Sequence, residues 1–291
     1  NFTFSINDPH FKSVENPVIH LGFLPASPSE NATIQVRRVD FSKNEAYRIQ
    51  INSNKIVLSA SEPIGVFRGL QTLKQVIGNR EYKDPIPCME IEDFPIIERR
   101  GFMLDVSRCK VPTMESVYSL IDLLAELRIN EFQLYIEHTF AFRDHHKVWE
   151  HASPFTPNEI RKIDRYCQDR FIELIPNLNS FGHFERWLRH QEYRHMAECP
   201  DGFHRQDPFM IREHGTTLKP NQTSLDFIDS LYSEYLPNFT SNKFNVGMDE
   251  PWELGQGWSK GEVEKKGKDK VYLNHLEGIR KCVESHGKEM Q

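Results

Sequence analysis

Two adjacent carboxylates, Asp249 and Glu250, stand where an apolar run gives way to turn-forming residues. The preceding segment 244–248 has the pattern of a short strand. Two acids at a strand end suit glycoside chemistry, in which one carboxyl group donates a proton and another supports positive charge developing at the sugar. Adjacent strand residues point to opposite faces, so a turn at Pro251 and Gly255 would have to redirect the second acid.

Further polar side chains follow three earlier apolar runs. They are Asp105, Ser107, Arg108, Glu137, His138, Asn177, Asn179 and His183. In a barrel the carboxyl ends of the strands converge on one axis, so these distant residues would share a pocket. Aromatic faces pack on pyranose rings, and the candidates for such a platform are Trp149, Trp187, Trp252 and Trp258. For each of these residues, packing or a surface ion pair is the structural alternative.

Composition and charge exclude several classes of function. The 291 residues include 36 basic and 42 acidic ones, a net charge of −6, and the basic residues are scattered, which argues against a nucleic-acid partner. No stretch approaches the roughly 20 apolar residues of a membrane span. No cofactor or metal is expected, because neither His145 and His146 nor the cysteines have ligand spacing. The five cysteines are widely spaced and odd in number, which favours a reducing compartment.

Residues 1–97 have the pattern of a small α+β domain. The runs 46–51 and 55–60 alternate like strands, and 61–78 has apolar residues at helical spacing. Pro95 forbids a continuous helix into the next part of the chain.

Strand-like and helix-like segments alternate strictly across residues 98–291. The expected strands are 101–106, 130–136, 171–178 and 243–248, and the expected helices are 114–127, 157–170, 224–236 and 270–287. Strands this apolar are expected to be buried on both faces of a parallel sheet. Long polar loops follow the strands and short ones precede them, which favours a (β/α)8 TIM-type barrel over a doubly wound sheet. Four βα units form the first half of such a barrel, and a fifth strand should begin at the end of the sequence.

The chain resembles glycoside hydrolase family 20, the β-N-acetylhexosaminidases, over nearly its whole length. The segment "EAYRIQI…KIVLSASEPIGVFRGLQTLKQV" looks like the small domain that precedes the family's barrel. "RRGFMLDVSR" resembles the first barrel strand, "NSFGH" the third-strand motif, and "VGMDE" the Gly-x-Asp-Glu signature.

The resemblance implies a retaining exo-glycosidase that removes terminal N-acetyl-β-hexosamine, GlcNAc or GalNAc. In this family the substrate's own 2-acetamido oxygen attacks the anomeric carbon, an exception to the two-carboxylate scheme. Glu250 would be the general acid/base and Asp249 would orient the acetamido group. Arg108 would bind sugar hydroxyls, and His183 would lie behind Glu250 and tune it.

Departures from the family pattern predict a divergent branch. Glu137 is the candidate for the usual acid after the second strand, and Asn177, Asn179 and Phe181 stand where Glu, Asp and Pro are common. The family's later strands are not in the sequence, which predicts a chain truncated after the fourth βα unit.

Two alternatives stay open. One is a glycosidase of other sugar specificity on the same barrel, with Glu137 or Asp105 as a second carboxylate about 5–5.5 Å from Glu250. The other is a non-catalytic sugar-binding or scaffold fragment. Carbohydrate is the expected partner, and self-association or a second chain would cover the strand edges of a half-barrel.

Overall fold

The computed structural model describes residues 2–26, 32–78, 85–206 and 209–291. The chain divides into two compact units. The first comprises Asn1–Arg100, Leu120–Asn130 and Tyr166–Ile172, and the second comprises Gly101–Ser119, Glu131–Arg165 and Glu173–Gln291. The first unit therefore includes the ends of two helices that begin in the second.

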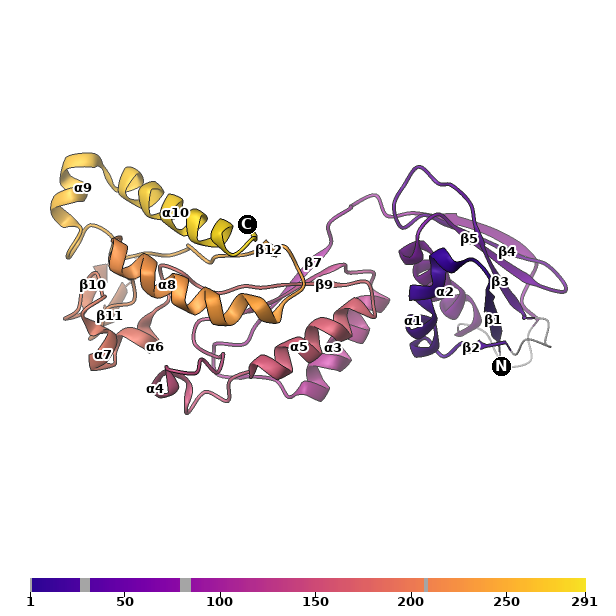
Figure 1. The fold of residues 1–291 in the computed structure, drawn as a ribbon, viewed down its shortest axis with the longest axis horizontal. Coiled ribbons are helices and arrows are strands. Elements are labelled where there is room, and N and C mark those ends of the chain that lie inside the picture. Colours follow the sequence, from indigo (N-terminus) through magenta and orange to yellow (C-terminus); the bar gives the residue numbers. More distant parts are fainter. Residues whose placement is uncertain (1, 27–31, 79–84, 207–208) are drawn as a thin grey trace. The chain divides into compact units, whose positions relative to one another are not determined.

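A six-stranded mixed sheet in the order β2-β1-β3-β5-β4-β6 forms the first unit (Figure 1). Its strands are β1 Thr3–Ile6, β2 Leu24–Pro25, β3 Ile34–Arg38, β4 Tyr47–Ile51, β5 Ile56–Ala60 and β6 Met89–Asp93. Its helices are η1 Pro9–Val14, α1 Glu15–His20 and α2 Pro63–Gly78. Two glycines let α2 approach the sheet closely, because a Cβ on Gly65 would lie 2.5 Å from the Ala46 carbonyl oxygen and one on Gly69 would overlap Leu58.

Successive parallel strands form the centre of the second unit. β7 Gly101–Asp105, β8 Glu131–Tyr135 and β9 Glu173–Ile175 make a parallel sheet, and β12 Lys243–Phe244 pairs in parallel with β13 Glu289–Met290. The two sheets are linked beyond β9 and β12, since Asn245 N donates to Pro176 O at 3.0 Å and Leu178 N to Asn245 O at 3.1 Å. The parallel strands therefore follow one another in the order β7, β8, β9, β12 and β13, which is the strand order of the first part of a (β/α)8 barrel.

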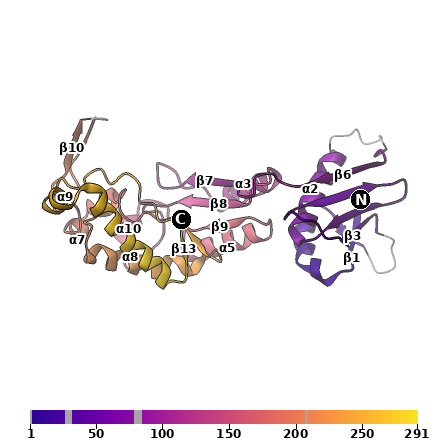
Figure 2. The ribbon, with the colours of Figure 1, turned by 90° about the horizontal axis from the view of Figure 1, so that it is seen from above.

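Helices alternate with these strands (Figures 1 and 2). The longer ones are α3 Met114–Glu126, α5 Pro157–Gln168, α8 Gln222–Tyr235 and α10 Lys268–Ser285. The loops after the strands hold α4 His146–Trp149, α6 Glu185–Leu188, α7 Gln191–Arg194, the hairpin β10 Phe203–Gln206 and β11 Phe209–Arg212, and α9 Lys260–Lys266, whereas η2 Leu236–Asn238 directly follows α8. None of the helices in the described ranges combines the length and hydrophobicity that a bilayer crossing requires.

The alternation of strands and helices predicted from the sequence is confirmed, including a fifth strand that begins at Glu289. Two details of the prediction are wrong. The third and fourth strands are shorter than expected, since Phe171 and Gly247 have φ angles of 55° and 51°, outside the β region. Burial on both faces fails for β7, where Phe102 and Met103 are 40% and 46% exposed, because β7 is an edge strand of the described sheet.

Candidate active site

The side chain of His183 lies among three carboxylates, one that follows β8 and two that follow β12. Its Nδ1 is 3.4 Å from Glu137 Oε1, and its Nε2 is 3.2 Å from Asp249 Oδ2 and 3.5 Å from Glu250 Oε2. The His183 side chain is 15% exposed, whereas those of Asp249 and Glu250 are 56% and 49% exposed. The acid pair is therefore open to a ligand, and the histidine supports it from within.

Arg108 connects the ends of β7 and β8. Its Nη1 donates to Asp105 Oδ2 at 2.6 Å, and its Nη2 lies 2.9 Å from Glu137 Oε1. The guanidinium also packs over the Tyr135 ring, 4.9 Å from its centroid. The Tyr135 hydroxyl in turn donates to Glu137 Oε1 at 2.9 Å and accepts from Asn179 Nδ2 at 2.8 Å. Tyr135 thus joins the residues that follow β8 and β9.

Neighbouring charges shift the pKa values of the residues in this cluster. Burial lowers the pKa of His183, but the hydrogen bond to Asp249 and the charges of Glu137 and Asp249 outweigh it and raise that pKa above its usual value. The hydrogen bond from His183 is the main reason that the pKa of Asp249 is lowered. Burial raises the pKa of Glu137, although the positive charge of Arg108 opposes this effect. The geometry and the charges together favour an ionised Asp249 next to a protonated His183.

Unusual backbone conformations bring the acid pair and His183 together. His183 and Glu250 have φ angles of 62° and 48°, which are uncommon for residues other than glycine. Gly182 permits the close approach of the two segments, because a Cβ there would overlap the Asp249 carbonyl oxygen and lie 3.1 Å from that of Glu250. Strained residues of this type concentrate at functional sites. In a regular strand two adjacent acids would point to opposite faces, whereas the turn at Glu250 leaves both within 3.5 Å of the same nitrogen of His183.

Two buried carboxylates hold the loop that follows the acid pair. Glu253 accepts hydrogen bonds from Thr216 N at 2.5 Å, Thr216 Oγ1 at 2.8 Å and Thr217 N at 3.3 Å. Glu198 accepts from Ser259 N at 3.0 Å and from Ser259 Oγ at 2.6 Å. Burial raises the pKa of Glu253 to about 7. These contacts fix the loop from its inner side.

Trp252 lies beside the acid pair, in a pocket of about 350 Å³ that Glu250 and Tyr272 also line. The guanidinium of Arg205 is 3.5 Å from the centroid of the Trp252 ring. Trp187 is completely buried, so it packs in the interior and offers no platform for a sugar. Trp252 therefore remains a candidate platform next to Glu250.

The residues selected from the sequence lie close together. Arg108, Glu137, His183, Asp249 and Glu250 form one contact network, Asn179 joins it through Tyr135, and Trp252 lines the adjoining pocket. In the described part of the chain, no group of three His, Cys, Asp or Glu side chains could hold a metal ion.

Three residues that support the candidate active site were not identified from the sequence. Tyr135 lies two residues before Glu137, so the strand alternation around β8 could have placed both on one face. Glu198 and Glu253 carried no signal, because a buried glutamate and a solvated one look alike in a sequence.

An α+β unit followed by parallel strands and helices, with carboxylates gathered at the strand ends, defines a (β/α)8-barrel protein with a candidate site at the C-terminal face of its strands. Residues 98–290 match glycosyl hydrolase family 20, catalytic domain, and residues 13–94 match glycosyl hydrolase family 20, domain 2. The chain therefore belongs to glycoside hydrolase family 20.

Curated relatives are about a quarter identical to the chain over the aligned residues. It is 26% identical over 277 residues to the beta-hexosaminidase of Porphyromonas gingivalis, covering 85% of this chain and 35% of the relative. It is 27% identical over 219 residues to beta-hexosaminidase subunit A1 of Dictyostelium discoideum, covering 71% of this chain and 39% of the relative. The chain thus spans well under half the length of either relative.

Solved structures share the fold. The GH20 exo-β-N-acetylglucosaminidase of Vibrio harveyi, in complex with N-acetylglucosamine, matches with a TM-score of 0.83 at 20% identity, over 99% of this chain and 50% of that one. The chitobiase of Flavobacterium johnsoniae matches with a TM-score of 0.79 at 24% identity, over 100% of this chain and 48% of that one. The predicted fold class, part of a (β/α)8 barrel preceded by a small α+β domain, is confirmed.

Proposed function

We propose that the protein is a retaining exo-β-N-acetylhexosaminidase that acts on carbohydrates ending in GlcNAc or GalNAc. The observation that carries this proposal is the contact of His183 with Asp249 and Glu250, at a turn that leaves both acids open to a ligand. The names of the similar proteins from Porphyromonas gingivalis and Dictyostelium discoideum support the same class of reaction.

In the proposed mechanism the substrate's 2-acetamido oxygen attacks the anomeric carbon as the glycosidic bond breaks. Glu250 protonates the leaving oxygen and the acetamido group closes to an oxazolinium ion. Asp249 is kept ionised by the hydrogen bond from His183. Its carboxylate accepts a hydrogen bond from the acetamido N–H and stabilises the positive charge of the oxazolinium ion. The Glu250 carboxylate then removes a proton from water as the water attacks the anomeric carbon. The bond between that carbon and the acetamido oxygen breaks, which regenerates the acetamido group and restores the original configuration.

The other selected residues have proposed roles in binding. Arg108 and Glu137, which already contact one another, would hydrogen-bond the sugar hydroxyls. Asn179 would position Tyr135 through their 2.8 Å hydrogen bond. Trp252 would pack against the sugar or the leaving group, since it lines the pocket next to Glu250.

We also propose a domain boundary between residues 97 and 98, with the small α+β domain at 1–97 and the barrel at 98–291. The family matches, which end at residue 94 and begin at residue 98, support this division. The free edge of β7 would pair with a further strand or be covered by a second chain, either another copy or a different one. The intact mass and the oligomeric state of the natural protein would distinguish these sources.

A second candidate function is a glycosidase of other sugar specificity, in which Glu137 would be the second catalytic carboxylate. Glu137 is partly buried near His183, but it is already in contact with Arg108 and Tyr135. These contacts suit a binding residue better than a nucleophile that must attack the anomeric carbon.

The proposed function is tested by hydrolysis of aryl β-N-acetylglucosaminide, aryl β-N-acetylgalactosaminide and the plain aryl β-hexosides. We expect the natural protein to cleave at least one acetamido substrate, and Glu250→Gln to lower kcat by about 10²–10⁴-fold because general acid–base catalysis is lost. Glu264→Gln, which changes an exposed acid on α9, is the matched control and should leave kcat unchanged. Cleavage of plain hexosides alone would favour the second candidate, and inactivity on every substrate would refute the proposal.

A further inference from the structure

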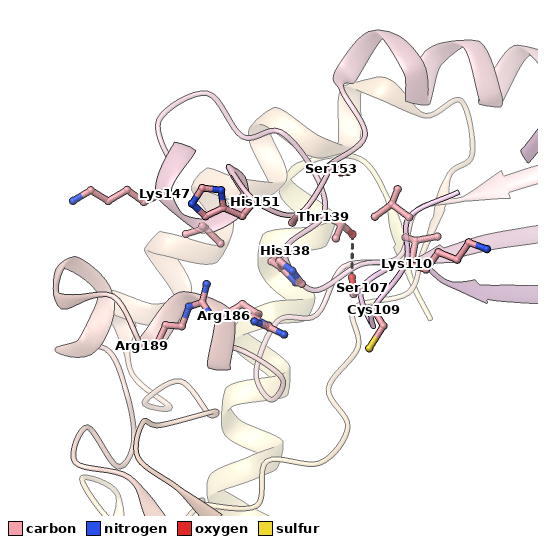
Figure 3. A pocket seen from close by; sticks show the side chains of 14 residues that line it. Ser107, Cys109, Lys110, His138, Thr139, Lys147, His151, Ser153, Arg186 and Arg189 are labelled. Atoms are coloured by element: carbon pink, nitrogen blue, oxygen red, sulfur yellow. Dashed lines mark hydrogen bonds between the residues drawn. The ribbon is translucent and has the colours of Figure 1, made fainter. Parts of the chain in front are cut away.

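A separate cavity of about 430 Å³ lies within the second unit (Figure 3). It is lined by residues that follow β7 and β8 and by residues of α4 and α6 and the loops beside them. Ser107 and His138, which the sequence predicted to share a pocket with the acid pair, line this cavity instead. Arg108, Glu137, Asn179, His183, Asp249, Glu250 and Trp252 do not line it. Its volume falls within the range of about 300–1,000 Å³ that is usual for small-molecule sites.

The lining of this cavity is basic. Six of its side chains carry or can carry positive charge: Lys110, His138, Lys147, His151, Arg186 and Arg189. All of the lining residues lie in the described ranges, and none of them is acidic. The cavity therefore has the charge of a site for an anion.

Carboxylates from outside the lining lie close to two of these basic groups. Lys147 Nζ is 2.5 Å from Glu192 Oε1, and His151 Nε2 is 3.7 Å from Glu150 Oε1. Among the described residues, no ion pair involves any of the remaining cations, Lys110, Arg186 and Arg189. A positive charge in excess of the local acids thus remains at the cavity.

His138 provides a buried polar group at the cavity wall. It is 6% exposed, and its Nδ1 has no hydrogen-bond partner among the described residues. Burial, together with the positive charges of Arg186 and Arg189, lowers the pKa of His138 to about 4. The ring is therefore neutral near pH 7 and keeps one N–H to donate. A buried ring nitrogen without a partner, next to two arginines, is a position for an acceptor-rich ligand (Figure 3).

The chemistry of these side chains selects the kind of ligand. Guanidinium groups bind tetrahedral oxyanions through two parallel hydrogen bonds, and such charge-assisted bonds are stronger than neutral ones. A bound anion would offset the mutual repulsion of Arg186 and Arg189, and it would accept a hydrogen bond from His138.

We propose that this cavity binds an oxyanion, a sulfate or phosphate group, through Arg186, Arg189 and His138. The group is either a free inorganic anion or a substituent of a larger molecule such as a sugar. This site is independent of the proposed glycosidase activity, because none of its residues has a role in that mechanism.

The test follows the ring signals of His138 by NMR while sodium sulfate or sodium phosphate is added at constant ionic strength. We expect a saturable shift in the natural protein. The double variant Arg186→Gln/Arg189→Gln should raise the Kd about tenfold or more, since each tenfold corresponds to about 1.4 kcal/mol, less than two charge-assisted hydrogen bonds contribute. Arg165→Gln, an exposed arginine on α5 outside the cavity lining, is the matched control and should leave the Kd unchanged.

The absence of a saturable shift with either anion would overturn the proposal. So would an equal loss of affinity in Arg165→Gln, because binding would then depend on net charge alone. Parallel titrations with glucose 6-sulfate and with glucose separate the two sources of the anion. Binding of glucose 6-sulfate at least tenfold tighter than inorganic sulfate supports a sugar-borne group, and equal affinity supports a small free anion.

Discussion

At the scale of single residues, His183 connects the three carboxylates of the candidate site. Its raised pKa means that its charged form stabilises the fold fully below pH 6.5, and that this contribution is lost as the pH rises through the folded-state value. The lowered pKa of Asp249 has the opposite consequence: its contribution is complete above pH 3.8 and is lost as the pH falls through its folded-state value. Both contributions to the stability of the fold are therefore fully present between pH 3.8 and pH 6.5.

This coupling predicts how the histidine titrates. In an NMR titration, the pKa of His183 should lie above 6.5, and Asp249→Asn should lower it because the hydrogen bond to a negative acceptor is lost. Asp201→Asn, which removes an exposed acid that pairs with Arg194, should leave the titration unchanged. A His183 titration that is the same in Asp249→Asn and in the natural protein would contradict the ion pair.

The sequence was enough to select residues of the candidate active site, but it did not show which hydrogen bonds join them. The motifs around Asp249 and His183 marked the acids and their neighbour, because the residues lie at the ends of recognisable strands. The hydrogen bonds through Tyr135, and the burial of Glu198 and Glu253, depend on which segments meet in space. Local sequence does not contain that information.

At the scale of elements, the candidate site depends on the close approach of the segment after β9 to the segment after β12. Ser180 N donates to Gly247 O at 3.2 Å, and a Cβ on Gly247 would overlap the side chain of Asn179. Gly182 leaves room for the backbone of Asp249. Glycine at both positions therefore has a structural reason that is independent of the chemistry of the acids.

Substitution of Gly182 should displace the backbone of Asp249 and Glu250 while both carboxyl groups stay chemically unchanged. In Gly182→Ala the new methyl group would displace the peptide of Asp249 and Glu250, and a misplacement of about 1 Å is expected to lower kcat/KM by about 10²-fold. Gly261→Ala on α9 is the matched control, since its Cβ would meet no atom within 4 Å and alanine favours a helix. The measurement is kcat/KM on the better aryl N-acetylhexosaminide, and equal values for the two variants would contradict the close approach.

The elements themselves were largely predictable. Apolar periodicity located α3, α5, α8 and α10 and the order of the strands, because these elements bury continuous apolar faces. Strand lengths and burial were less predictable. They depend on backbone turns at Phe171 and Gly247 and on which neighbour β7 has in the sheet.

At the scale of the whole molecule, the chain combines a small mixed sheet with part of a (β/α)8 barrel, and each has its own buried core. The barrel part holds two neighbouring polar sites with opposite charge. Asp249 and Glu250 supply carboxylates to one, and Arg186 and Arg189 supply cations to the other. Adjacent residues after β8 belong to different sites, since Glu137 contacts His183 and His138 lines the cavity.

The central claim is that the substrate's acetamido group is the nucleophile and that Asp249 and Glu250 assist it. Its most direct test is kcat/KM for a series of aryl β-glucosaminides whose N-acyl group is acetyl, fluoroacetyl, difluoroacetyl or trifluoroacetyl. Fluorine withdraws electrons from the acyl oxygen, so we expect kcat/KM to fall steadily along the series. A rate that does not change with fluorination would contradict it, because a protein carboxylate would then be the nucleophile.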